Sequence, residues 1–138
     1  MQISFQGQSV YALASGSSRV LIAPEYGARL LQWTVDGREI IHWPDDADWS
    51  NAHSVAHTRG GNPILFPFVA RHYADGVLGQ WRDGAGVIRK LPMHGFARDM
   101  PFQVVEASNK VLRMRLTPTE STHAMYPFDF IFDHCCPK

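Results

Sequence analysis

Short apolar runs alternate with turn-forming residues along the first third of the chain, and this pattern predicts β-strands. The runs are Tyr11–Ser15, Arg19–Ala23, Ala28–Val35 and Arg38–Trp43. Asp36-Gly37 separates the last two, and an Asp-Gly pair between β-rich runs indicates a hairpin because Gly accepts the positive φ of a tight turn. We therefore expect antiparallel strands that follow one another along the chain.

A second hairpin is predicted between Phe102–Glu106 and Val111–Leu116, with its turn at Ser108-Asn109. In the second arm, apolar residues alternate with Arg113 and Arg115. A period of two residues is typical of a strand with one buried and one solvated face. We expect the arginines on the solvated face.

The remaining pattern predicts a further strand and two long loops. The composition of Phe128–Phe132 is typical of a strand. Residues 134–138 then interrupt this pattern, without a turn or a partner strand. Pro44–Gly61 and Tyr73–Gly86 have the composition of loops, where binding residues are often found. No segment has a long apolar period of about 3.6 residues, and nine prolines interrupt the chain. We predict an all-β fold of antiparallel sheets with little helix.

Length and charge restrict the class of protein. A chain of 138 residues with 45% hydrophobic residues is expected to form a single domain, residues 1–138. The 13 basic and 13 acidic residues balance, so neither nucleic acid nor an anionic membrane is an expected partner. We expect no signal peptide and no transmembrane segment. The only cysteines, Cys135 and Cys136, cannot form a disulfide framework, and a cytoplasmic protein is expected.

Two segments concentrate the candidate binding chemistry, Gly60–Arg71 and Leu91–Asp99. Each surrounds one polar side chain with apolar and aromatic residues, Arg71 in the first and His94 in the second. A sugar site needs this combination, because an apolar wall stacks on the C–H face of the ring while polar groups hold its hydroxyls. Gly95 allows the backbone to approach a ligand closely. Taken singly, a His94 bonded to local backbone and an Arg71 in a surface ion pair are the more ordinary interpretations.

The four tryptophans divide by their surroundings. Trp33 and Trp43 lie in strand-like runs and are expected in the core. Trp49 and Trp81 lie in loop-like sequence and are better placed to stack on a sugar ring.

Seven histidines prompt a search for a metal site. His53 and His57 are four residues apart and His72 follows, but the sequence between the first two lacks the glutamate of the helical metalloprotease motif. We therefore expect no metal, and keep a metal-dependent β-sandwich that uses His53, His57 or His72 as an alternative. Arg98-Asp99 is expected to form a local ion pair on a turn.

Three segments together resemble a known family: Asn62–Arg71, Leu91–Phe102 and Tyr126–Phe130. In this order they are similar to motifs of the aldose 1-epimerase (galactose mutarotase) family, in particular its bacterial branch with a His-Gly-Phe-Ala-Arg motif. The resemblance covers nearly the whole chain. It implies a galactose mutarotase-like β-supersandwich that binds a free hexose on its concave face. The implied activity is that of an isomerase that interconverts α and β anomers by acid–base ring opening, without a cofactor.

The resemblance also implies roles for individual residues. Arg71 would hold sugar hydroxyls, and His94 would form a hydrogen bond near the reacting oxygens. Gly95 and Phe96 would shape the turn that carries His94. Ala70 stands where some members of the family carry Asn, so the resemblance supplies no hydroxyl contact at that position.

The family's general acid, a second histidine, and its general base, a glutamate, belong to later motifs that this chain does not contain. We therefore expect an N-terminal portion of an epimerase, cut short, whose uncovered sheet edges favour self-association. Two alternatives stay open. A non-catalytic carbohydrate-binding β-sandwich would keep Arg71 and His94 without an acid–base pair. A hexose-6-phosphate epimerase would bind the phosphate with Arg59, Arg82 or Arg89.

Overall fold

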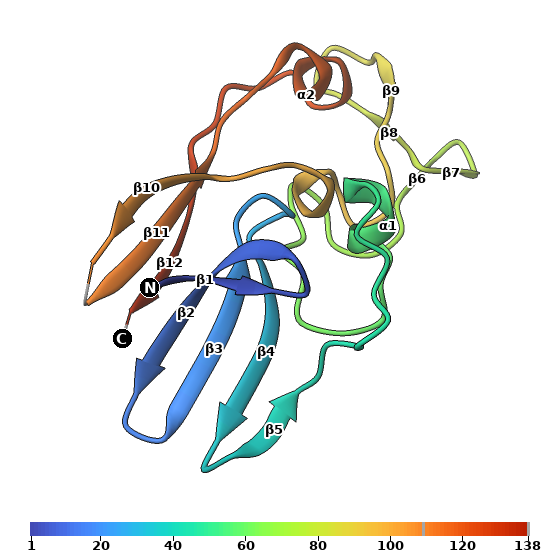
Figure 1. Ribbon diagram of the computed structural model, residues 1–138. Helices are drawn as coiled ribbons and strands as arrows, with labels where there is room; N and C mark the ends of the chain where they lie inside the picture. The colour runs from blue at the N-terminus through green and yellow to red at the C-terminus, as the bar shows by residue number, and fades with distance from the viewer. Residues whose placement is uncertain (109, 138) are drawn as a thin grey trace.

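The computed structural model describes residues 1–108 and 110–137, and it consists mainly of antiparallel sheets (Figure 1). The first sheet has the strand order β1-β2-β3-β4-β5. Its strands are β1 (Gln2–Phe5), β2 (Gln8–Ser15), β3 (Ser18–Ala23), β4 (Arg29–Val35) and β5 (Arg38–Ile41). Asp36 and Gly37 both have positive φ, of 49° and 73°, and connect β4 to β5. The predicted series of antiparallel strands is confirmed.

The second sheet has the order β10-β11-β12, formed by β10 (Gln103–Ala107), β11 (Val111–Leu116) and β12 (Phe132–Pro137). The alternation predicted for β11 is confirmed, because Leu112, Met114 and Leu116 are buried. Asn109, in the predicted turn at Ser108-Asn109, lies outside the described residues.

The last strand differs from its prediction. Phe128–Phe132 was expected to form a strand that breaks off, but β12 begins at Phe132 and pairs with the whole of β11 as far as Pro137. The rings of Phe128 and Phe130 instead pack against Tyr126. The strand forms at residues 132–137 because these residues lie along the edge of β11 that faces away from β10. The backbone groups of that edge supply their hydrogen-bond partners.

The two predicted loops are more ordered than their composition indicates. Pro44–Gly61 contains the helix α1 (Ala52–Ala56), which begins because the side chain of Asn51 accepts a hydrogen bond from the Ser54 N–H. Tyr73–Gly86 holds a small hairpin of β6 (Tyr73–Ala74) and β7 (Val77–Leu78). It also holds the strand β8 (Gln80–Arg82), which pairs with β9 (Ile88–Lys90) just after the segment. Glycines that the sequence suggested as loop residues thus form the turns.

Two further short helices complete the described chain: η1 (Ala97–Asp99), a single 3-10 turn, and α2 (Glu120–Met125). A capping box between Thr119 and Thr122 begins α2. The helical elements are short, which agrees with the expected small helix content. None of the helices in the described ranges is long and apolar enough to cross a membrane.

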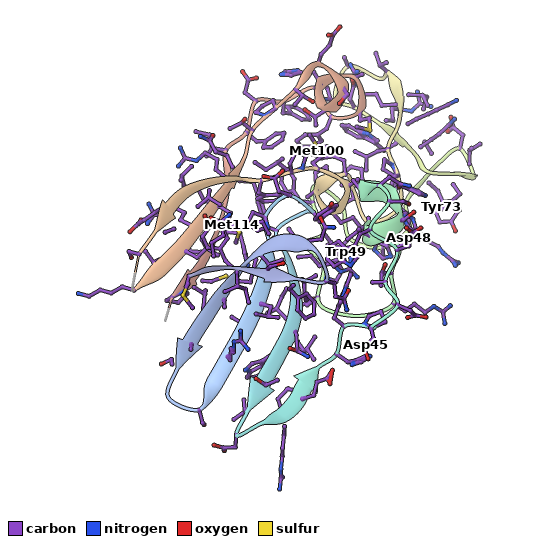
Figure 2. All side chains as sticks on the ribbon, in the orientation of Figure 1. Asp45, Asp48, Trp49, Tyr73, Met100 and Met114 are labelled. Carbon is purple, nitrogen blue, oxygen red and sulfur yellow. The ribbon has the colours of Figure 1, made fainter. Side chains whose placement is uncertain are left out.

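The first sheet is covered by apolar side chains on both faces. On β3, Ile22 packs into a cluster shared with β11, whereas Leu21 and Ala23 pack into a second cluster that contains Trp43 and Val55. Figure 1 shows β10–β12 beside the first sheet, with α1, α2 and the small hairpins gathered at the end away from the β2–β3 turn. Figure 2 shows Met114 among the side chains that fill the space between the sheets.

A buried arginine connects the first sheet to the segment that follows α1. Arg29, 4% exposed at the start of β4, donates hydrogen bonds to the carbonyl oxygens of Ala56 (3.2 Å), Thr58 (2.8 Å) and Gly60 (2.7 Å). Its guanidinium also lies 5.3 Å from the ring centre of Trp43. Burial lowers the pKa of Arg29 to about 10, so the side chain stays charged at neutral pH. The sequence pattern gave no sign of this role.

Replacement of Arg29 by Met is expected to destabilise the fold. The substitution leaves three backbone acceptors without their donor, which costs about 3 kcal/mol of unfolding free energy. Urea denaturation followed by circular dichroism measures this loss. Arg19→Met, at an exposed position on β3, is the matched control and should change stability by no more than about 0.5 kcal/mol. Equal stability of the two variants would contradict the role assigned to Arg29.

Candidate functional site

The two candidate segments lie against each other at Phe66. The carbonyl oxygen of Phe66 accepts hydrogen bonds from the backbone N–H groups of Phe96 (2.9 Å) and Ala97 (3.2 Å). Gly95 forms an isolated parallel bridge with Phe66 and has a φ of 79°. A side chain at position 95 would collide with the Phe66 carbonyl group, so this contact requires glycine.

A second contact joins the same segments at Ala70 and His94. The His94 N–H donates to the Ala70 carbonyl oxygen (3.1 Å), and the Ala70 N–H donates to Nδ1 of the His94 ring (3.0 Å). Both residues have left-handed backbone, with φ of 66° for Ala70 and 69° for His94. This conformation is unfavourable for residues other than glycine, and such strain is concentrated at functional sites. Arg71 follows directly in the chain.

The hydrogen bond from Ala70 determines which nitrogen of His94 carries the proton. Because Nδ1 accepts, the neutral ring is protonated at Nε2, and this group can donate to a ligand. The side chain of His94 is half-buried, and that of Arg71 is exposed. Within residues 1–108 and 110–137 the guanidinium of Arg71 forms no hydrogen bond or ion pair. The contact therefore places the ring of His94 beside Ala70, the residue that precedes Arg71 in the chain.

An aromatic cluster lies beneath these segments. Phe66 contacts Phe96, Phe130 and Phe132, with ring centres 5.9 Å, 5.0 Å and 4.8 Å away. Phe68 contacts Trp81 edge-on at 5.3 Å. Phe96 is 3% exposed, so it supports the turn from below instead of presenting its ring at the surface.

The tryptophans suggested for sugar stacking are engaged in packing. Trp81 donates from Nε1 to the Met125 carbonyl oxygen (2.9 Å) and packs in the aromatic cluster. Trp49 donates to Gln6 and lies 5.3 Å from Trp43. Trp43 is 1% exposed, as expected for a core residue. Both rings are half-buried and are held by contacts to residues far along the chain, and their suggested role in stacking on a sugar stays a prediction.

A cavity of about 380 Å³ lies beside the turn that carries His94. Its volume is in the range of small-molecule sites. Apolar and polar side chains both line it, including Met93, Phe96, Met125, Arg98 and His57.

Arg98 and Asp99 do not form the local ion pair expected from the sequence. Nη2 of Arg98 lies 3.3 Å from the Met93 carbonyl oxygen and 3.5 Å from Nε2 of His57. The carboxylate of Asp99 turns toward His53 instead, with Oδ1 3.6 Å from Nδ1. The η1 turn separates the two neighbouring side chains, which explains the difference.

The histidines singled out as metal candidates are only partly brought together. His53 and His57 lie on or beside α1 with ring centres 4.1 Å apart. His72 is elsewhere, where its ring packs edge-on against Phe68 and both ring nitrogens are buried without a partner among the described residues. Asp99 takes the third position near the His53–His57 pair. Sequence reasoning missed Asp99 because nothing local relates it to α1.

The arginines considered for a phosphate differ in availability. Arg82 pairs with Asp75 (2.7 Å), and Arg89 pairs with Asp83 (2.7 Å). The Arg89 guanidinium holds the pKa of Asp83 below its usual range. Arg59 is exposed and makes no ion pair in the part of the chain that the structure describes.

Comparison with known proteins identifies the family. The model of the aldose 1-epimerase family matches residues 9–133, so this chain belongs to that family. A provisionally named glucose-6-phosphate 1-epimerase of Escherichia coli K12 is 29% identical over 109 residues, which cover 75% of this chain and 31% of the relative. A similarly named protein of Salmonella typhimurium LT2 is 29% identical over 110 residues, with the same shares covered.

Solved structures show the same fold. A crystal structure from Synechocystis sp. PCC 6803 superposes with a TM-score of 0.79 and 26% identity, over 99% of this chain and 47% of that one. A galactose mutarotase-like protein from Lactobacillus casei superposes with a TM-score of 0.71 and 24% identity, over 91% of this chain and 38% of that one. The all-β galactose mutarotase-like fold expected from the sequence is confirmed. The chain spans about a third of the length of the curated relatives it matches.

Replacement of Gly95 by Ala is expected to separate the two segments. The added methyl group meets the Phe66 carbonyl, and the positive φ is unfavourable for alanine, so stability should fall by about 3 kcal/mol. Gly84→Ala is the control, because the space around its Cβ is open and it should change stability by no more than about 0.5 kcal/mol. Urea unfolding midpoints compare the two, and a tolerated alanine at position 95 would rule out the close approach.

Proposed function

We propose that this chain provides the hexose-binding surface of an aldose 1-epimerase-type isomerase, which interconverts the α and β anomers of a free aldose. The reciprocal hydrogen bonds between Ala70 and His94 carry the proposal, because they hold the ring of His94 one residue away from Arg71. The family membership of residues 9–133 supports it.

In this proposal, the Nε2–H of His94 donates to a sugar oxygen near the reacting centre, and Arg71 donates in a fork to neighbouring hydroxyls. Gly95 and Phe96 support the turn that carries His94. Ring opening needs a base that takes the proton of the C1 hydroxyl and an acid that protonates the ring oxygen. We assign neither role to a residue of this chain. We infer that parts of the longer family proteins outside the matched region supply them.

A phosphorylated hexose is the second candidate substrate. It is supported by Arg59, whose exposed guanidinium makes no ion pair among the described residues. Arg59 directly precedes Gly60, whose carbonyl oxygen accepts a hydrogen bond from Arg29. Guanidinium groups bind phosphate with two parallel hydrogen bonds. The provisional names of the relatives from Escherichia coli and Salmonella typhimurium agree with this substrate class.

Titration calorimetry with galactose, glucose and glucose 6-phosphate tests the binding surface. Arg71→Met and His94→Gln should each weaken binding about tenfold, because each removes a donor to the sugar. Arg19→Met should leave affinity unchanged.

Arg59→Met tests whether the phosphate is recognised. It should weaken the binding of glucose 6-phosphate but not of glucose. Absence of binding to all three sugars, or equal binding by all variants, would contradict the proposal.

Polarimetry separates binding from catalysis. Mutarotation of α-glucose and α-galactose should proceed at its spontaneous rate in the presence of the 138-residue chain, since no acid or base is assigned to it. A rate well above the spontaneous one that is lost in His94→Gln would show that the chain supplies its own acid–base pair. The placement of those groups outside the matched region would then be wrong.

A further inference from the structure

We propose that His53, His57 and Asp99 form a binding site for a divalent transition-metal ion of the zinc class. The proposal is independent of the sugar site. Its starting point is that one ligand atom from each of the three side chains lies within 4.8 Å of the other two. Two imidazole nitrogens and one carboxylate oxygen form a ligand set that zinc accepts, with a fourth position left open.

The fold brings these residues together from two separate elements. His53 and His57 are four residues apart, so α1 and its C-terminal residue present them on one face, with ring centres 4.1 Å apart. Asp99 ends η1, which packs against α1. Figure 1 shows α1 beside this single turn. The juxtaposition depends on Arg29, which holds the chain directly after α1.

The distances are close to those of a bound state. Two ligands of a tetrahedral zinc ion with bonds of about 2.1 Å lie roughly 3.4 Å apart. Nδ1 of His53 and Oδ1 of Asp99 are already 3.6 Å apart. Both histidine side chains are exposed, so a small rotation brings the third ligand into place without disturbing the core.

His57 is oriented as metal-binding histidines generally are. Its Nδ1 lies 2.9 Å from the His53 carbonyl oxygen, so Nδ1 carries the proton and donates. Nε2 is then unprotonated and available to a metal. Such a bond from the second ring nitrogen to a backbone carbonyl fixes the tautomer and the ring orientation of zinc ligands.

Arg98 provides a competing interaction. Its Nη2 lies 3.5 Å from Nε2 of His57, and a cation there opposes a metal ion. The same Nη2 also donates to the Met93 carbonyl oxygen at 3.3 Å, which holds the cation beside His57, so its removal should favour the metal. The 380 Å³ cavity, which Arg98 and the three proposed ligands line, gives a fourth ligand access to the metal.

Calorimetric titration of the metal-free chain with zinc chloride tests the site, with the visible absorption of bound cobalt as a second readout. We expect one ion per chain and the cobalt spectrum of a tetrahedral site. Asp99→Asn and His57→Gln should each weaken binding tenfold or more, and Arg98→Met should strengthen it. If these exposed residues do not bind a metal, Arg98→Met will leave the cobalt absorption unchanged.

Two controls exclude other ligands. His42→Ala removes an exposed histidine whose side chain pairs with Glu39, outside the proposed ligand set, and should not change affinity. Cys136→Ser removes the thiol that lies 3.3 Å from Nε2 of His134, another pair of side chains of the type that zinc binds. Circular dichroism verifies that each variant is folded. If a ligand variant is unfolded, the affinity of His53→Gln is measured in its place. No binding at micromolar zinc, or binding that Cys136→Ser abolishes and Asp99→Asn does not, would overturn the proposal.

Discussion

The candidate site depends on the contact between two segments that are far apart in sequence. Phe66 and Ala70 supply backbone groups to the turn that contains His94 and Gly95, and only glycine at position 95 allows the approach. The bond from Ala70 to Nδ1 then determines the tautomer of His94. One contact thus places the imidazole of His94 and determines which of its nitrogens carries the proton. Arg71 follows Ala70 directly in the chain, and aromatic rings pack beneath the two segments.

The sheet and a buried charge support this contact from the other side. Apolar clusters on both faces of the first sheet provide a fixed platform. Arg29 extends that platform to the segment after α1 by binding three carbonyl oxygens. A buried charge without such partners would be costly, so the loop and the guanidinium stabilise each other. The position of α1, and with it of His53 and His57, follows from this arrangement.

Sequence reasoning succeeded where the cause of structure is local. Asp36-Gly37 predicts its hairpin because the turn needs positive φ, and the alternation around Arg113 predicts the buried face of β11. It failed where distant groups decide. Asp99 faces His53 instead of its neighbour Arg98, and the last strand begins only at Phe132, where β11 lies beside it. The grouping of His94 with Arg71 came from composition and family resemblance, but the strained backbone at Ala70 that joins them has no local signature.

The tautomer of His94 tests this account most directly. Long-range proton–nitrogen correlation NMR of the uniformly labelled chain distinguishes the two neutral forms of each histidine ring. The contact between the segments predicts that His94 is protonated at Nε2 with Nδ1 as a hydrogen-bond acceptor, and that the Ala70 amide exchanges slowly with solvent. A proton on Nδ1 together with fast exchange of that amide would show that the two segments do not meet as described.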